Sequence, residues 1–241
     1  MDGVIDQGAH PVDAPLHTFE ARAVLLDIEG TISPIRFVRD VLFGYSRTHL
    51  ARFIAARRGD PVVAAILEQV SLLAGGGDPV AALEAWQARD EKAPPLKKIQ
   101  GLIWNEGYRS GAFRSPIFAD ALAALRRWKA AGLPLYIYSS GSVQAQLQFF
   151  EFNEAGDLRA LFSGHYDTDI GPKIEAASYM RIASQIGVPS QSVVFLSDNP
   201  AELEAASAVG FKVVHVVKDA AAPAPQFPEI TDFEQVDVSL G

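Results

Sequence analysis

Cysteine is missing from the 241-residue sequence, and histidine is scarce. The lack of cysteine excludes disulfide bonds, thiolate catalysis and cysteine-ligated zinc or iron–sulfur sites. The five histidines are scattered and form neither HExxH nor another spaced metal motif. The two residue types therefore supply no recognisable metal site.

An excess of positive charge is also missing, since 29 acidic residues outnumber 21 basic ones and give a formal net charge of −8. Without a basic field to attract nucleic acid or an anionic membrane, we expect neither as a partner. No apolar run approaches the ~18 residues of a membrane span. Residues 1–20 carry neither the basic nor the apolar segment of a signal peptide, so we expect a cytoplasmic monomer with an N-terminal extension over these residues.

Short apolar runs bounded by turn residues recur along the chain, as is typical of strands buried on both faces of a parallel sheet. Between them lie helical patterns, such as the one in which Leu122, Leu125 and Trp128 share a face before Gly132. Strands that alternate with helices predict an α/β fold with a doubly wound, mainly parallel sheet. The predicted strands are Ala23–Leu26, Leu133–Tyr138, Val193–Leu196 and Val213–Val217.

Residues 37–114 interrupt this alternation, because they contain four helical patterns and no convincing strand. A helical insert directly after the first strand is well placed to cover the carboxyl edge of the sheet, where α/β folds bind ligands. We therefore predict an α/β catalytic core of residues 21–36 and 115–241 with an inserted all-helical cap over residues 37–114. The segment 219–232 is rich in proline and alanine, and no structure is assigned to it. The expected cap helices are Phe37–Arg58, Pro61–Leu73, Pro79–Arg89 and Leu96–Arg109.

Four polar clusters follow the predicted strands. A parallel sheet brings the ends of its strands to one edge, so carboxylates, a lysine and hydroxyl groups would share a crevice there. Clustered carboxylates without histidine or cysteine favour Mg²⁺, and Mg²⁺ beside a lysine indicates a phosphate site. The clusters are Asp27–Thr31, Ser139–Ser142, Lys173 and Ser197–Asn199.

The first cluster can carry out phosphoryl transfer. Asp27 is a carboxylate that needs no deprotonation at neutral pH to attack phosphorus, which would give an aspartyl-phosphate. Glu29 lies two residues later and points the same way if the chain stays extended, so it could protonate the leaving alkoxide and later deprotonate a water. Gly30 would let the backbone turn away without a clash. These residues predict a phosphatase.

The order of these motifs resembles the haloacid-dehalogenase superfamily of phosphatases, which has DxxGT, a strand ending in Ser, a downstream Lys and a strand ending in acidic residues. The helical insert is similar to that superfamily's cap of the first type. Glu29, at a position where most of these phosphatases carry Asp, narrows the match, as do "LLDIEGTISPIRFVRDVLFGY", "LYIYSSGSVQAQ" and "GHYDTDIGPKIEAASY". Over roughly residues 21–217 the chain looks like the enolase-phosphatases, or acireductone synthases, of methionine salvage.

This resemblance implies that Asp27 is the nucleophile and a Mg²⁺ ligand, and that Glu29 is the acid/base with its main-chain carbonyl on the metal. It implies that Asp198 completes the metal site. The substrate would be 2,3-diketo-5-methylthiopentyl-1-phosphate, which is enolised and then hydrolysed to the acireductone 1,2-dihydroxy-3-keto-5-methylthiopentene. The residues implied to bind the phosphoryl oxygens are Ser139, Ser140 and the catalytic Lys173.

Two other functions remain open at this point. The chain could be a phosphatase of the same superfamily that acts on another small phosphorylated metabolite, or an inactive phosphometabolite-binding protein. Asn199 is explained as well by a helix N-cap as by a role in the site. Trp104 is expected in the core of the insert or in an apolar wall that suits a thioether.

Overall fold

The main sheet of the computed structural model, which describes residues 16–91, 93–218 and 224–241, has six parallel strands. Their order is β4-β3-β2-β5-β6-β7, so the first predicted strand lies in the interior of the sheet. The predicted α/β class and the mainly parallel sheet are confirmed. The strands are β2 (Ala23–Leu26), β3 (Leu135–Tyr138), β4 (Gly164–Tyr166), β5 (Val193–Ser197), β6 (Lys212–Val216) and β7 (Glu229–Ile230).

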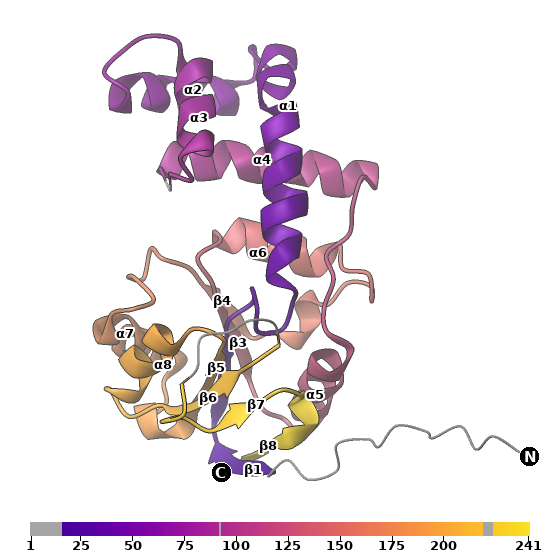
Figure 1. Cartoon of the computed structure of the whole chain (residues 1–241), viewed down its shortest axis with the longest axis vertical. Helices are drawn as coiled ribbons and strands as arrows, with labels where there is room; N and C mark the ends of the chain where they lie inside the picture. The colour runs from indigo at the N-terminus through magenta and orange to yellow at the C-terminus, as the bar shows by residue number, and fades with distance from the viewer. Residues whose placement is uncertain (1–15, 92, 219–223) are drawn as a thin grey trace, which may run out of the picture.

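Helices cover both faces of this sheet, which explains why its strands are apolar throughout (Figure 1). Val24 and Leu26 of β2 belong to a buried cluster that also contains Trp128 of α5. The alternate residue Leu25 belongs to a second cluster on the other face, together with Tyr179 of α7. The helices around the sheet are α5 (Ala119–Ala130), α6 (Val143–Glu151), α7 (Ala176–Ile186) and α8 (Pro200–Ser207).

Four further helices stand together at one end of the molecule, at the top of Figure 1, and pack around a hydrophobic cluster of their own. Asp60 and Asp78 cap two of them by accepting hydrogen bonds from main-chain N–H groups of the first turn, each followed by proline at the first helical position. In the described part of the chain, no helix combines the length and the apolar character needed to cross a membrane. These helices are α1 (Phe43–Ala56), α2 (Pro61–Leu73), α3 (Pro79–Ala88) and α4 (Pro94–Ser110).

The first predicted helix of this region is divided. Residues Phe37–Leu42 form the π-helix η1, which runs directly into α1. The indole N–H of Trp104 donates a hydrogen bond of 2.7 Å to the carbonyl of Leu42. Single π-helical turns beside α-helices are frequent at functional sites.

Two strands form a second, parallel sheet that the sequence analysis did not foresee. β1 (His17–Ala21) lies partly in the segment treated as an extension, and it pairs with β8 (Val236–Leu240) near the end of the chain. β7 lies in the segment 219–232, to which no structure was assigned, and pairs with β6 through Ile230; residues 219–223 of that segment lie outside the described residues. The boundaries of core and cap stay a prediction. Short 3₁₀-helices complete the fold at Arg159–Leu161, Ser190–Ser192 and Phe233–Gln235.

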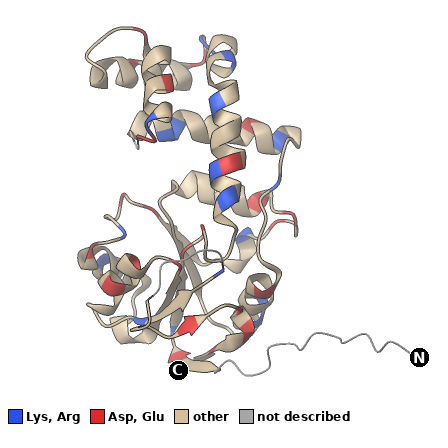
Figure 2. Ribbon diagram, in the orientation of Figure 1, with Lys and Arg blue, Asp and Glu red and all other residues tan. Residues whose placement is uncertain are grey.

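Acidic and basic residues are interspersed over both the helical region and the sheet region (Figure 2). Ion pairs between them at the surface, such as that of Arg159 with Asp157, contribute little to stability individually.

Candidate active site

The register of the main sheet brings the predicted motifs together. Leu26, the last residue of β2, pairs with Ile137 of β3 on one side and with Leu196 of β5 on the other. The polar clusters that follow these strands therefore leave the sheet at the same height, as the sequence predicted. These clusters are Asp27–Thr31, Ser139–Ser142 and Ser197–Asn199.

The Asp27 side chain is almost fully buried, with 3% of the residue exposed, and both of its carboxylate oxygens have partners. Oδ2 accepts a hydrogen bond of 2.8 Å from Thr31 Oγ1, and Oδ1 accepts one from the ammonium of Lys173. Thr31 also accepts a hydrogen bond of 3.0 Å from the main-chain N–H of Asp198. Thr31, to which the sequence analysis gave no role, thus links the Asp27 and Asp198 segments.

The buried ammonium of Lys173 lies between two carboxylates, those of Asp27 and Glu202. Its Nζ is 2.7 Å from Glu202 Oε2, and Tyr179 Oη fixes the main chain by donating to the Lys173 carbonyl at 2.7 Å. Burial alone would lower the pKa of Lys173, but the two negative charges raise it above its usual value. The lysine therefore stays charged at neutral pH.

Glu202 is a member of this site that the sequence analysis missed. An acidic residue in the first turn of a helix such as α8 is explained by the helix dipole alone, but Glu202 also accepts a hydrogen bond of 3.0 Å from Ser197 Oγ. Burial, with the nearby charge of Asp27, raises the pKa of Glu202 to about 7. The sequence does contain one sign of this role: Glu202 follows Asp198 by four residues, on a helix that begins at the same sheet edge.

The Glu29 carboxylate lies beside Ser139, whose hydroxyl donates to Oε2 at 3.1 Å. Burial, followed by the charge of Asp27, raises the pKa of Glu29 above its ordinary value. A carboxyl group in this environment holds a proton more readily than an exposed glutamate does. This is the property expected of a general acid.

Ser140 and Ser142 lie at the N-terminal end of α6, in the segment that follows Ser139. Ser142 caps this helix by accepting a hydrogen bond of 3.3 Å from the N–H of Ala145. Together with the Ser139 hydroxyl, such a terminus suits an anion. Asn199, by contrast, caps α8 by accepting from Ala201 N at 3.0 Å, so its structural explanation is confirmed.

The Asp198 carboxylate packs against the loop that follows Asp27. Gly30 has a φ of +83°, and a Cβ atom at this position would lie 2.1 Å from Asp198 Oδ2, so only glycine fits. Burial and the charges of Asp27 and Glu202 raise the pKa of Asp198 to about 7. Carboxylates crowded in this way favour a cation beside them.

The same carboxylates fit a small hard cation. Within the described residues, no three acidic or histidine side chains come together as a complete metal site. Asp27 and Asp198 would therefore supply two carboxylates, and main-chain carbonyls or water would complete the shell. Such a donor set matches the preference of small divalent cations for oxygen ligands and retained water.

A cavity of about 480 Å³ separates this sheet edge from the helical region. Glu29 and Ser139–Ser142 line the cavity on the side of the sheet edge. We call these residues, together with the buried groups of the sheet edge behind them, the floor of the cavity; the buried groups are Asp27, Lys173, Asp198 and Glu202. The opposite wall, formed by residues of η1, α1, α3 and α4, is the roof. On α4 the roof residues recur every three or four positions and so share one helical face: Lys97, Gln100, Trp104 and Tyr108.

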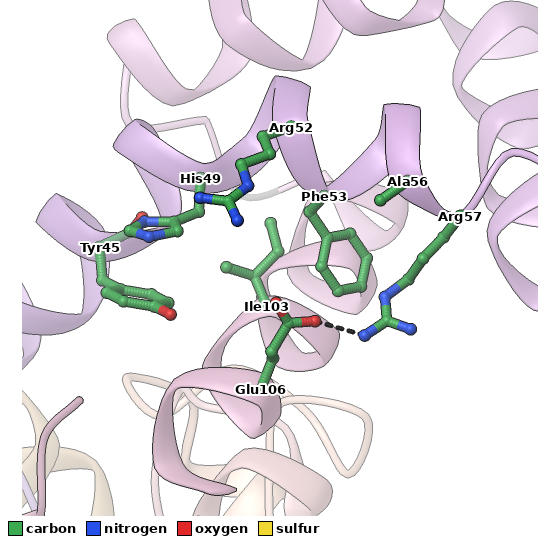
Figure 3. Close-up of a pocket in the computed structure, with 8 residues that line it drawn as sticks. All are labelled: Tyr45, His49, Arg52, Phe53, Ala56, Arg57, Ile103 and Glu106. Carbon is green, nitrogen blue, oxygen red and sulfur yellow. Dashed lines mark hydrogen bonds and ion pairs between the residues drawn. The ribbon is translucent and has the colours of Figure 1, made fainter. Parts of the chain in front are cut away.

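A smaller hollow of about 240 Å³ lies between α1 and α4 (Figure 3). Arg57 forms an ion pair with Glu106 there and lies 4.7 Å from the centre of the Phe53 ring. Tyr45 and His49 stack with ring centres 3.8 Å apart. Of these contacts, only the exposed ion pair between Arg57 and Glu106 joins α1 to α4; the other two lie within α1 and its C-terminal cap.

A family model of haloacid dehalogenase-like hydrolases matches residues 21–210 of the chain. Enolase-phosphatase E1 of Bradyrhizobium sp. (strain BTAi1 / ATCC BAA-1182) is 64% identical over 219 residues, which cover 91% of this chain and 95% of the relative. The chain belongs to the enolase-phosphatase family. Enolase-phosphatase E1 of Aquifex aeolicus is 42% identical over 90% of this chain and 99% of its own length.

A solved structure is similar to this chain in both sequence and fold. The UTR4 protein of Saccharomyces cerevisiae superposes with a TM-score of 0.75 at 34% identity, covering 89% of this chain and 99% of the yeast chain. The family predicted from the DIEGT and SSGS segments is therefore confirmed, as are the haloacid-dehalogenase-like fold and the class of phosphatase hydrolases.

Proposed function

We propose that this protein enolises 2,3-diketo-5-methylthiopentyl-1-phosphate and then hydrolyses its phosphate ester, releasing the acireductone 1,2-dihydroxy-3-keto-5-methylthiopentene in methionine salvage. The observation that carries the chemistry is the buried Asp27 carboxylate, held by Lys173 and Thr31 at the same sheet edge as Glu29. Membership of the enolase-phosphatase family supports the choice of substrate. The cavity volume suits a small phosphorylated metabolite.

In the first half of the hydrolysis, an Asp27 carboxylate oxygen attacks phosphorus. A bond forms between this oxygen and phosphorus, and the bond from phosphorus to the ester oxygen breaks. The leaving oxygen takes a proton from Glu29, whose raised pKa suits a proton donor. The product of this half is an aspartyl-phosphate and the free enol.

In the second half, a water molecule releases the phosphate. Glu29, now ionised, accepts a proton from the water, and the water oxygen attacks phosphorus while the bond to Asp27 breaks. Lys173 opposes the negative charge of the phosphoryl group throughout, and the hydroxyls of Ser139 and Ser140 donate to its oxygens. Inorganic phosphate leaves, and Asp27 and protonated Glu29 are restored.

The cation in this proposal is Mg²⁺. Asp27, Asp198 and the main-chain carbonyl of Glu29 would hold it, and when bound it draws charge from the phosphoryl oxygens. Mg²⁺ is commonly bound through one or two carboxylates and substrate phosphate, whereas Ca²⁺ takes six to eight oxygen ligands. The two carboxylates at this edge favour Mg²⁺. The cytoplasmic location and the monomeric state stay predictions from the sequence.

The test is phosphate release from the diketo ester and from p-nitrophenyl phosphate in the presence of Mg²⁺. Asp27→Asn should reduce the rate on both substrates by at least about a thousandfold, because the nucleophile is lost while the shape is kept. Asp237→Asn makes the same change at an exposed position of β8 and should leave both rates unchanged.

Three outcomes would contradict the proposal in different ways. Asp27→Asn activity within tenfold of the wild type would exclude Asp27 as the nucleophile. A wild-type enzyme that hydrolyses only the simple ester would indicate another small phosphorylated metabolite as the substrate. A wild-type protein that hydrolyses neither ester would indicate a phosphometabolite-binding protein.

A further inference from the structure

Two glutamines in the roof of the cavity are held side by side. Gln87 on α3 and Gln100 on α4 are 8% and 6% exposed, and both line the cavity. The hydroxyl of Ser46 donates to Gln87 Oε1 at 2.6 Å, and Gln100 Nε2 donates to the same oxygen at 3.4 Å. The position of the Gln87 amide is thereby fixed from two sides.

This network uses only part of the hydrogen-bonding capacity of the two amides. Each amide offers one acceptor oxygen and two N–H donors. Among the described residues, no hydrogen bond engages the nitrogen of Gln87 or the oxygen of Gln100. If both amides were turned over, their roles would exchange, and again one amide nitrogen and one amide oxygen would be left. Because both residues border the cavity, these groups are available to a molecule inside it.

The surroundings make these free groups unusual. The buried side chains of the roof beside them are apolar, as in Leu42 and Trp104, whereas the charged residues of the lining, such as Lys97, are exposed or half-buried. A polar group in such a wall loses free energy unless it finds a partner. Gln146 in the same cavity shows the opposite pattern, because its nitrogen donates at 2.8 Å to two main-chain carbonyls and its oxygen contacts a histidine ring. Gln146 is therefore structural, whereas the roof pair has capacity for a ligand.

We propose that Gln87 and Gln100 bind a ketone oxygen of the substrate and so determine specificity. This inference rests on the proposed function, in which the phosphate lies at the floor and the neutral diketone extends from it toward the roof. A neutral amide donor matches a neutral carbonyl acceptor without bringing a charge into the apolar part of the cavity. Ser46 is a positioning residue, since it acts through Gln87.

The experiment compares Gln87→Met and Gln100→Met with the wild type on the diketo ester and on p-nitrophenyl phosphate, which has no ketone. Methionine keeps the length of glutamine and removes its hydrogen bonds. For Gln87→Met, kcat/KM should fall by about tenfold to a hundredfold on the diketo ester and by less than about threefold on p-nitrophenyl phosphate. Gln69→Met is the matched control, because Gln69 is exposed on α2 and should tolerate the same change on both substrates.

Two more variants keep the test decisive. If Gln87→Met fails to fold, Gln87→Asn retains the amide but shortens its reach, and it should show the same selective loss. Ser46→Ala should reproduce part of the selective loss, because Ser46 holds the Gln87 amide in position. If Ser46 only supported the fold, the ratio of kcat/KM on the diketo ester to kcat/KM on p-nitrophenyl phosphate would not change.

Equal losses on both substrates would overturn the inference by assigning the pair to packing, and so would unchanged rates on the diketo ester. A wild-type enzyme that does not turn over the diketo ester would overturn the proposed function and this inference together. An active wild type with non-selective variants would overturn the inference alone.

Discussion

The floor and the roof of the cavity are built on opposite principles. At the floor, charged groups are buried against each other, with Lys173 between Asp27 and Glu202. The buried polar groups of the roof are neutral, with the Gln87 and Gln100 amides beside apolar side chains. In the proposed function the difference separates two tasks, because the floor would carry the reacting charges and the roof would shape the space around the substrate.

The difference also has an energetic side. Burial of like charges raises the pKa values of Glu29, Asp198 and Glu202, so the floor is stable only while its partners remain in place. Changes at the floor should therefore reduce the rate on every substrate. Changes in the roof should alter which substrate is preferred.

After Asp27→Asn, the change with the largest expected effect is Gly30→Ala. The added Cβ would lie 2.1 Å from Asp198 Oδ2 in a backbone conformation that favours glycine, so Asp198 must move. Displacement of a reacting group by about 1 Å lowers the rate on the order of a hundredfold, and we expect at least this loss of rate on both substrates. Mg²⁺ should also bind more weakly, so that half-maximal activity requires a higher Mg²⁺ concentration. Mg²⁺ titrations of activity would measure both effects. Gly59→Ala meets no atom within 4 Å and is the control; a Gly30→Ala variant as active as Gly59→Ala would refute the close packing at the floor.

Glu202→Gln should have the next largest effect. It removes one of the two charges that hold Lys173, and hydrogen bonds to charged groups contribute about 1.5–3 kcal/mol. We expect roughly a tenfold loss of kcat on both the diketo ester and p-nitrophenyl phosphate. Glu204→Gln, on the same helix and exposed, is the control. If the two variants behave alike in steady-state kinetics, Glu202 acts only at the helix N-terminus.

Trp104→Phe tests the roof. The change removes the hydrogen bond of 2.7 Å to the Leu42 carbonyl, which should lower the free energy of unfolding by about 1–3 kcal/mol because a buried carbonyl loses its partner. KM for the diketo ester should rise several-fold while kcat changes little. Urea unfolding and steady-state kinetics give the two values. Trp86→Phe, in the hydrophobic cluster of the helical region, is the control for lost ring volume. A large fall in kcat for Trp104→Phe would contradict the contrast between floor and roof.

Asp120→Asn, away from the cavity, should leave activity unchanged and affect only stability. Burial alone would raise the pKa of Asp120, but hydrogen bonds from Lys218 and from the main-chain N–H of Phe233 lower it below its usual value. A depressed pKa contributes stability above the unfolded value of about 3.9, and this contribution is lost as the pH falls through the folded pKa.

Thermal and urea unfolding at several pH values would measure this effect. The free energy of unfolding of the wild type should exceed that of Asp120→Asn by about 1 kcal/mol at pH 7. This difference should disappear at pH values below about 4. A difference that does not change with pH would show that the ion pair is not its cause.

The sequence predicted the floor better than the roof. The bounds of β2 were predicted correctly because a short run buried on both faces is distinctive, and Asp27 follows it directly. Glu202 was missed because its place in the first turn of α8 has a sufficient local explanation. Its contact with Lys173 depends on two segments that meet only in the folded chain.

Other features were hidden for the same physical reason. β1 and β8 show alternating burial, but each is short, and their pairing joins opposite ends of the chain. The π-helix η1 depends on where Trp104 lies, so no local pattern separates it from α1. Single glutamines within helices look like surface residues until the fold shows that they are buried.

The hydrogen bond from Trp104 to Leu42 has a consequence for motion. The helical region is joined to the sheet region through η1 at one end and through the segment after α4, where Gly111 has a φ of +74°, at the other. Because the bond ties η1 to α4, both connections to the sheet region follow helices that are fastened to each other. If the helices swung about these connections, η1 and α4 would move together. Lys97 Nζ would then separate from Thr168 Oγ1, which lies 3.4 Å away. The carboxylates of Asp27, Glu29 and Asp198 lie on neither helix, so such a swing would leave them in place.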